Sequence, residues 1–407
     1  MDDFLHLDGL LHCEEIALDA LADEVSTPAY VYSTRTIRRH IRRLREAFAP
    51  ADPHICYAVK ANANLAVLRL FVDEGTGFDI VSGGELSRVL RVGGDPSRVV
   101  FSGVGKTEAE MVAALEAGIR LFNVESEEEL DVLAGVAARI GRVAPVAIRV
   151  NPDVDPKTHR YVTTGRKENK FGVDLDRAAR LARRARALES VTLRGLQCHI
   201  GSQITTVEPY VAAVEKTLAL AKRLRAEGDA LATFDMGGGF GITYDDPDVA
   251  ELDDYARAVM PLLEGSGLEL LMEPGRVIVG NAGVLLTRVL FNKVSGEKRF
   301  VIVDAGMNDL IRPALYGGGH RIWPVRGESP PPLGEVAPWP PCDIVGPVCE
   351  TGDFLARDRP LPPLARGDLL AVRGVGAYGF TMASNYNERP RPGEVLVGGA
   401  PYGGGRG

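Results

Sequence analysis

Short apolar runs alternate with amphipathic segments along the first two thirds of the chain. Between residues 55 and 273, eight runs are apolar almost throughout: ICYAV, FDIV, VVF, LFNV, VAIRV, LQCHI, TFDM and LELLME. Segments with helical periodicity, such as AEMVAALEAG and PYVAAVEKTLALAKRLRAEG, separate them. Strands without a polar face are typical of a parallel sheet that helices cover. Eight such units over roughly 220 residues predict a (β/α)8 TIM barrel.

A polar or conformationally special residue follows each run. In chain order these are Lys60, Ser82, Ser102, Asn123, Asn151, His199, Gly237 and Glu273. The carboxyl ends of barrel strands converge on one face, where active sites are built. A lysine at a strand end is more often solvated when it is considered alone. In this context, however, we expect Lys60 to face a pocket, opposite His199.

Both ends of the chain have a different pattern. PAYVYS near the N-terminus and GVLLTRVLFNKV, KRFVIVDAG and GDLLAVRGVGAYG beyond residue 281 are short strands with Gly, Pro and Asp between them. This pattern predicts an all-β domain of the Greek-key, sandwich-like kind that includes the N-terminal strand. We therefore expect a barrel over residues 36–280 and a β domain over 1–35 and 281–407.

Composition and charge exclude several classes of partner. The chain of 407 residues is 45% hydrophobic with a net charge of −8, which disfavours binding to nucleic acid or anionic membranes. The spacing of the five cysteines matches neither a disulfide framework nor a zinc site. The N-terminus lacks the basic start and apolar stretch of a signal peptide, and no apolar run could span a bilayer. We expect a cytoplasmic protein.

Two motifs after the last strands suggest a phosphate site. DMGGGFG places Gly237–Gly239 directly after a strand, where backbone N–H groups can approach an anion. MEPGR brings Glu273 and Arg276 beside that loop, and phosphate sites recur between the last strands of barrels. CHIGSQ adds His199 and Ser202. No second histidine or carboxylate stands at metal-ligand spacing, so we expect no metal.

A barrel lysine, a phosphate cradle and a buried glutamate suit pyridoxal 5'-phosphate. This cofactor needs a lysine to attach to, an anchor for its phosphate and a group that tunes its pyridine nitrogen. A class I aldolase, in which Lys60 attacks a carbonyl substrate directly, is the alternative barrel chemistry. That alternative gives the β domain no task.

The serial motifs also carry a family resemblance. YAVKANAN, FDIVSGGEL, HIGSQ, GGGFG, EPGR, DAGMNDLIRPALY, GPVCETGD and GAYG occur in order from about residue 25 to about residue 398. They resemble the motifs of diaminopimelate decarboxylases, fold-type III pyridoxal-phosphate enzymes with a barrel and a C-terminal β domain. The resemblance implies decarboxylation of meso-2,6-diaminopimelate to L-lysine and CO2, the last step of lysine biosynthesis.

The resemblance implies roles for particular residues at the cofactor. Lys60 would hold the cofactor covalently, His199 would stack on its pyridine ring, and Glu273 would keep the ring nitrogen protonated. The residues that would bind the phosphate are Ser202, Gly237, Gly238, Gly239, Pro274, Gly275, Arg276 and Tyr378.

Other residues are implied at the substrate. Arg276 and Arg312, with Tyr316 and Tyr378, would bind it, because a distal carboxylate pairs well with arginine. Glu350 suits the distal ammonium. The family site lies at a homodimer interface, so Cys349 and Glu350 would reach the other subunit's site, and Cys349 would donate the proton to the product carbon.

Several alternatives stay open at this point. Decarboxylases of ornithine or arginine act on substrates without a distal carboxylate and do not need the arginine of LIRPALY. A pyridoxal-phosphate racemase would be expected to lack the pair of Arg312 and Glu350. A non-catalytic vitamin-B6-binding barrel would resemble the barrel half alone. The long loop 151–172 is predicted to be a lid over the barrel mouth.

Overall fold

The chain folds into two compact units, which a computed structural model describes for residues 3–155, 169–244, 248–328, 331, 335 and 337–398. The first, here called the β unit, comprises residues 1–40, 242–249 and 276–407. The second, the barrel unit, comprises residues 41–241 and 250–275. Most of the predicted lid, residues 156–168, lies outside the described residues, as do parts of the Pro-rich stretch and the end of the chain.

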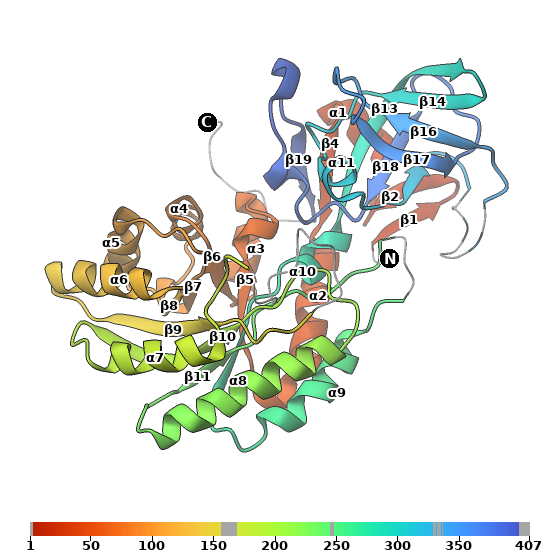
Figure 1. The fold of residues 1–407 in the computed structure, drawn as a ribbon. Helices are drawn as coiled ribbons and strands as arrows, with labels where there is room; N and C mark the ends of the chain where they lie inside the picture. The colour runs from red at the N-terminus through yellow and green to blue at the C-terminus, as the bar shows by residue number, and fades with distance from the viewer. Residues whose placement is uncertain are drawn as a thin grey trace. The chain divides into compact units, whose positions relative to one another are not determined.

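The barrel unit is a closed ring of eight parallel strands in the order β10-β11-β12-β5-β6-β7-β8-β9, which confirms the predicted fold class (Figure 1). The strands are β5 (His54–Ala58), β6 (Gly77–Ile80), β7 (Val99–Phe101), β8 (Leu121–Val124), β9 (Ala144–Val150), β10 (Val191–Cys198), β11 (Thr233–Asp235) and β12 (Glu269–Met272).

Helices follow the barrel strands, and Figure 1 shows them along the outside of the ring. They are α3 (Leu65–Asp73), α4 (Gly83–Arg91), α5 (Glu108–Ala117), α6 (Glu127–Arg139), α7 (Leu175–Arg186), α8 (Glu208–Ala226) and α9 (Leu252–Leu263). Local sequence fixes where several begin. The side chains of Asn64, Ser82 and Ser126 accept hydrogen bonds from backbone N–H groups of the first turns. Such caps satisfy donors that have no partner inside the helix.

The barrel interior is apolar in its middle and polar toward one end. Five buried residues from five different strands form one cluster: Cys56, Val100, Leu121, Ala147 and Leu271. Because each comes from a different strand of the ring, the cluster fills the barrel as a packed core rather than a pore.

The β unit holds two sheets. A small sheet consists of β1 (Phe4–Leu7), β2 (Leu10–Cys13) and β3 (Ile16–Ala17). The large sheet has eight strands: β4 (Ala29–Ser33), β13 (Gly283–Ser295), β14 (Lys298–Val303), β15 (Ile322–Pro324), β16 (Pro341–Val345), β17 (Phe354–Pro360), β18 (Leu369–Arg373) and β19 (Gly393–Val397). The N-terminal strand β4 pairs with β13 and β19, so the predicted inclusion of an N-terminal strand in the β domain is confirmed.

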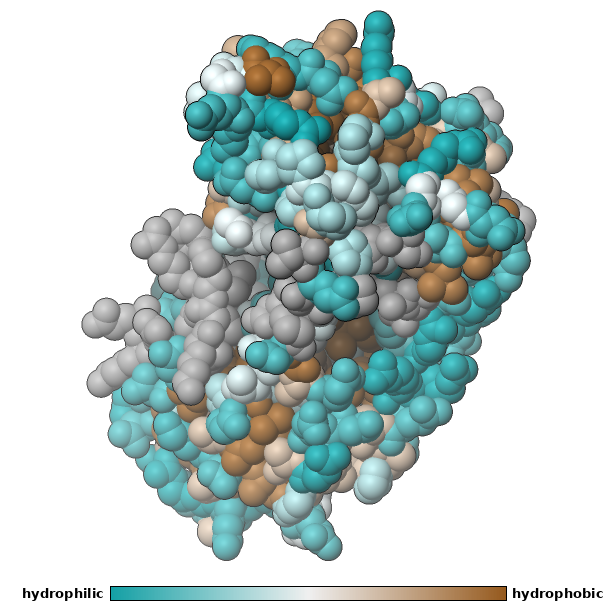
Figure 2. All heavy atoms as spheres, turned by 90° about the vertical axis from the view of Figure 1, so that its right-hand side faces the viewer, coloured by the Kyte–Doolittle hydropathy of each residue, from teal (hydrophilic) through white to brown (hydrophobic). Residues whose placement is uncertain are grey.

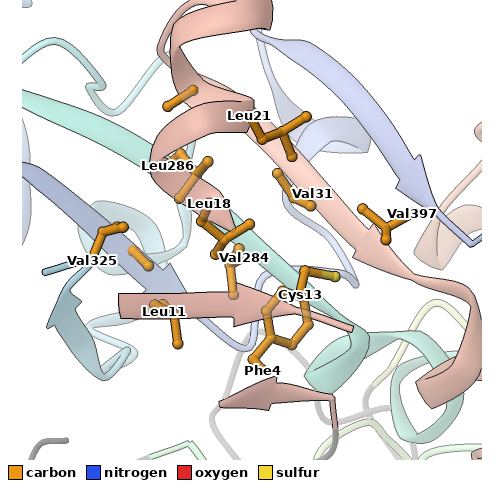
Figure 3. Packing of buried hydrophobic residues seen from close by; sticks show 12 residues of the cluster. Phe4, Leu11, Cys13, Leu18, Leu21, Val31, Val284, Leu286, Val325 and Val397 are labelled. Carbon is orange, nitrogen blue, oxygen red and sulfur yellow. The ribbon is translucent and has the colours of Figure 1, made fainter. Parts of the chain in front are cut away.

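One apolar core joins the distant parts of the β unit. Residues from both ends of the described chain pack together in Figure 3, including Phe4, Leu11, Leu18, Val284 and Val397. The helix α1 (Leu18–Val25) contributes Leu18, Leu21 and Ala22 to this core. The N-terminal segment is therefore held to the later strands by side-chain packing as well as by the β4 hydrogen bonds.

Three more α-helices lie in the described residues: α2 (Thr34–Ala47), α10 (Arg276–Val279) and α11 (Arg312–Tyr316). Hydrophilic side chains with scattered hydrophobic ones cover the face shown in Figure 2. Within the described part of the chain, none of the helices has the length and hydrophobicity needed to cross a membrane.

Candidate active site

Lys60 lies directly beyond β5 and contacts a buried carboxylate. Its Nζ lies 2.5 Å from Oδ2 of Asp79 on β6, and 36% of the Lys60 side chain is exposed against 0% of the Asp79 side chain. A buried carboxylate is costly unless a positive charge or hydrogen bonds compensate it. Asp79 therefore holds the lysine amine at the barrel mouth, where the sequence had placed it.

Glu273 lies just beyond β12 inside a ring of polar side chains. Its Oε1 accepts hydrogen bonds from Ser102 Oγ at 3.1 Å and Asn123 Nδ2 at 2.9 Å. Its Oε2 accepts one from Gln197 Nε2 at 3.1 Å. The donors come from the strands β8 and β10 and from the end of β7, so the barrel closure itself assembles this pocket for a carboxyl group.

Asp235 makes the Glu273 environment strongly acidic. Burial raises the pKa of Glu273 well above its usual value, and the nearby charges of Asp235 and Asp79 raise it further. Burial also raises the pKa of Asp235 to about 6. Two carboxyl groups that share a buried site cannot both ionise cheaply. The pair therefore favours holding one proton between the two carboxyl groups.

His199, which follows β10, is held as a neutral ring. Its Nδ1 accepts a hydrogen bond from the backbone N–H of Gly238 at 3.3 Å. Burial lowers the pKa of His199 well below its usual value, and the charges of Arg149 and Lys60 lower it further. An uncharged imidazole offers a flat surface for stacking and no competing positive charge beside the lysine.

The glycine loop after β11 passes very close to neighbouring backbone. A Cβ on Gly238 would lie 2.0 Å from the carbonyl oxygen of Glu273, and one on Gly239, whose φ is +106°, would lie 2.2 Å from that of Gly201. Only glycine allows both approaches. The N–H groups of Gly237 and Gly238 already donate within the protein, to Asp235 and His199. The role of these two amides at a phosphate stays a prediction.

The EPGR segment lies against the lysine turn. Pro274 O accepts a hydrogen bond from the N–H of Ala58 at 3.0 Å, and a Cβ on Gly275 would meet the Cβ of Ala61 at 2.9 Å. Ala58 and Ala61 flank Lys60 within two residues. The segment that carries Glu273 is thus fixed beside the segment that carries Lys60. Ser202, two residues beyond Ile200, is half-buried.

These residues fit pyridoxal phosphate by their chemistry. Asp79, Asp235 and Glu273 are buried in the barrel, and the amine of Lys60 contacts Asp79 and acts electrostatically on Glu273. An acidic pocket of this kind suits a ring nitrogen that carries a proton, and the lysine amine suits covalent attachment of an aldehyde. Lys60, Glu273 and His199 are the residues that would hold the ring.

The β unit brings together four of the predicted substrate residues. The guanidinium carbon of Arg276 lies 4.8 Å from the ring centre of Tyr378, and that of Arg312 lies 5.5 Å from the ring centre of Tyr316. Burial lowers the pKa of Arg312, and the positive charge of Arg276 lowers it further. The two arginines therefore form a buried cationic cluster that is lined by aromatic rings.

Cys349 and Glu350 lie in one turn of the β unit. The N–H of Cys349 donates to Asn387 Oδ1 at 2.9 Å, and Tyr386 Oη donates to Glu350 Oε1 at 2.6 Å. Cys349 is exposed, whereas the other four cysteines are buried. The exposed Cys349 thiol, next to Glu350 in the chain, could therefore contact a ligand.

Sequence reasoning missed Asp79, Gln197 and Asp235 as site residues. Each is a polar residue inside a mostly apolar run, in FDIV, LQCHI and TFDM respectively. In a strand covered by helices, a lone polar side chain is tolerated where it points into a polar part of the barrel. Such a polar residue within a strand run is the sequence feature that could have identified these site residues. Tyr244 was missed as well, and no pattern around it marks it.

Comparisons with known proteins agree on one family. Residues 34–280 match the model of the pyridoxal-dependent decarboxylase pyridoxal-binding domain. The chain is 52% identical over 393 residues to a diaminopimelate decarboxylase of Vibrio cholerae, covering 96% of this chain and 92% of that one. It is also 52% identical over 399 residues to one of Pseudomonas aeruginosa, covering 98% and 94% of the two chains.

Solved structures give the same picture. Diaminopimelate decarboxylase of Helicobacter pylori, complexed with L-lysine, is 42% identical with a TM-score of 0.88, covering 93% of this chain and 94% of that one. The M. jannaschii enzyme, also with L-lysine, is 37% identical with a TM-score of 0.90, covering 97% and 93%. Lysine/ornithine decarboxylase of Vibrio vulnificus, at 23% identity and a TM-score of 0.81, shares the fold.

The buried acid pair predicts a pH dependence of stability. The pKa of Asp235 rises on folding from 3.8 to about 6, so between these values the folded protein binds more protons than the unfolded chain. The free energy of unfolding should therefore fall as pH rises through this window, by on the order of 3 kcal/mol from Asp235. Urea unfolding of the cofactor-free protein from pH 4 to 7 measures this slope.

The comparison with Asp235→Asn isolates the buried group. The stability difference between wild type and Asp235→Asn should shift in favour of the variant as pH rises. Glu128→Gln, which removes an exposed carboxylate on α6, is the control. A wild-type–to–variant difference that stays constant from pH 4 to 7 would show that Asp235 is not protonated in the fold.

Proposed function

This chain belongs to the diaminopimelate decarboxylase family of pyridoxal-dependent decarboxylases, and from that membership we propose that it converts meso-2,6-diaminopimelate to L-lysine and CO2. The observation that carries the proposal is the lysine amine of Lys60 at the mouth of a barrel whose interior holds a protonated acid pair. Two similar proteins have been solved with L-lysine, the product expected here. This reaction is the last step of lysine biosynthesis.

The cofactor and the barrel residues would have separate chemical roles in the reaction. When bound, pyridoxal phosphate supplies the electron sink for the pair of electrons that departing CO2 leaves behind. Lys60 would hold the cofactor, and its amine is the group that would move protons. Glu273, whose pKa is raised by burial and by Asp235, would keep a proton beside the ring nitrogen. His199 would cover one face of the ring without adding charge.

The β unit supplies the substrate groups. Loss of CO2 leaves a carbon that needs a proton, and the exposed thiol of Cys349 is the proposed donor. Arg276 and Arg312 would take the carboxylate at the distal end of diaminopimelate, with Tyr316 and Tyr378 beside them. Glu350 would take the distal ammonium. The assignments of Arg276 and Tyr378 to the cofactor's phosphate rest on the family resemblance.

A direct assay tests the function. Purified, cofactor-loaded protein should release CO2 from meso-diaminopimelate and far less from ornithine or arginine. Lys60→Ala should lose almost all turnover, since the lysine both holds the cofactor and transfers protons. Borohydride reduction followed by peptide mapping should label Lys60. Preferred turnover of ornithine or arginine, or racemisation without CO2 release, would favour the alternative activities instead.

We expect Arg312 to determine the specificity for a substrate with a distal carboxylate. Its side chain is buried and it has no carboxylate partner among the described residues, so removing it would delete the charge-assisted contact proposed with the distal carboxylate. Arg312→Ala should lower kcat/KM for diaminopimelate about 30- to 1000-fold, the equivalent of roughly 2–4 kcal/mol. The absorbance of the bound cofactor should not change.

Two comparisons complete this test. Arg366→Ala removes an exposed arginine that also lies over an aromatic ring, that of Phe291, and should leave activity intact. Residual activity of Arg312→Ala on substrates without a distal carboxylate should fall far less than that on diaminopimelate. An equal loss on every substrate, or release of the cofactor, would make Arg312 a structural residue.

We also propose that the protein is a cytoplasmic homodimer in which the β domain, expected over residues 1–35 and 281–407, contributes to the interface and to the partner's site. Support comes from Cys349 and Glu350, which lie in a different unit from Lys60. Lys60→Ala and Cys349→Ala subunits, each inactive alone, should regain partial activity when mixed, because one hybrid site would then carry both wild-type residues. Proven subunit exchange without any recovery would reject shared sites.

A further inference from the structure

Tyr244 stands at the centre of the arginine cluster of the β unit, although no motif marks it. It follows the glycine loop, in the segment 242–249 that belongs to the same compact unit as Arg276 and Arg312. Tyr244 is separated from Arg276 by 32 residues of chain and lies still further from Arg312 in sequence, so only tertiary folding brings the three residues together.

Tyr244 contacts both arginines in different ways. Its hydroxyl oxygen accepts a hydrogen bond from Arg276 Nη1 at 2.5 Å. The guanidinium carbon of Arg312 lies 4.9 Å from the centre of its ring. A cation over an aromatic face is attracted by the negative face of the ring. One side chain therefore offsets part of the charge of two guanidinium groups and fixes the position of each.

The Tyr244 ring is itself held in place. The imidazole of His320 packs edge-on against it, with the ring centres 5.1 Å apart and the planes at 85°. On another side the backbone of Gly374 approaches so closely that a Cβ there would lie 3.2 Å from Cδ1 of the tyrosine. These neighbours on two sides restrict the ring and so favour one direction for its hydroxyl.

His320 adds packing without adding charge. Its Nδ1 lies 2.8 Å from the carbonyl oxygen of Arg373, which places the ring proton on Nδ1. Burial lowers the pKa of His320 to about 3, and the charge of Arg312 lowers it further. The imidazole packed against Tyr244 is thus neutral and adds no positive charge beside Arg312.

A neutral oxygen on Tyr244 is what an anion site requires here. An Asp or Glu in this place would also orient Arg276, but its charge would compete with an incoming carboxylate. The groups that act most strongly on the pKa of Arg312, apart from burial, are three tyrosines and Arg276, none of which is a carboxylate. Buried cations with aromatic neighbours therefore keep most of their attraction for a ligand anion.

We propose that Tyr244 is a specificity-determining positioning residue that holds Arg276 and Arg312 ready for the carboxylate of the amino-acid end that does not react. The proposal rests on the proposed function and deepens it. Because CO2 leaves from one end of diaminopimelate only, the product L-lysine keeps this carboxylate. The compound 1,5-diaminopentane is lysine without it, so these two ligands separate recognition of the carboxylate from recognition of the amines.

Binding to the cofactor-loaded enzyme tests Tyr244. Tyr244→Phe keeps the ring and removes the oxygen that Arg276 contacts, and should weaken L-lysine binding about tenfold. The affinity for 1,5-diaminopentane should not change. KM for diaminopimelate should rise by a similar factor while kcat stays within about twofold, because the contact exists before and during reaction. Tyr244→Leu, which also removes the ring under Arg312, should weaken lysine further.

The controls separate a structural effect from a specific one. Tyr32→Phe in the same unit removes another phenol oxygen, one that contacts Glu394 at 2.8 Å, and should leave both affinities unchanged. Cofactor absorbance and melting temperature show that each variant is folded and loaded. If Tyr244→Phe weakened lysine and 1,5-diaminopentane equally, or neither of them, the proposal would be overturned. A wild-type enzyme that binds lysine but releases no CO2 would overturn the proposed function instead.

Discussion

The site depends on the placement of three carboxyl groups inside a closed barrel. Asp79, Asp235 and Glu273 are almost completely shielded from water, and buried charge of one sign is among the most costly arrangements in a protein. The fold offsets that cost in two ways. Lys60 neutralises Asp79, and a proton shared by the other two removes one negative charge. Polar side chains from neighbouring strands donate hydrogen bonds to both oxygens of Glu273.

This arrangement gives the site properties that exposed groups would not have. An acid that keeps its proton at neutral pH can donate a hydrogen bond to a ring nitrogen. It can also transfer the proton to that nitrogen. A lysine tied to a buried aspartate has a defined position although part of its side chain is exposed. The chemistry therefore follows from electrostatics that barrel closure imposes, since the groups involved come from strands at opposite ends of the unit's sequence.

The buried charges of the β unit cluster are positive, and they are stabilised differently from the carboxyl groups of the barrel. Its arginines are surrounded by aromatic rings and a neutral imidazole, which stabilise the cations without neutralising them. The acidic barrel end suits a cationic ring, and the cationic cluster suits a carboxylate. The distal carboxylate of the proposed substrate would match the cationic cluster, which is the physical basis of the specificity proposed here.

The sequence by itself determined the barrel, the strand that the N-terminus adds to the large sheet, and the strand-end positions of Lys60, His199 and Glu273. It could do so because strand periodicity and strand-end chemistry are local properties of the chain. Only the tertiary structure decided that Asp79 pairs with Lys60, that Asp235 raises the pKa of Glu273, and that Tyr244 lies between two arginines. Those relations join residues far apart in the chain, and their strength comes from burial, which no local pattern records.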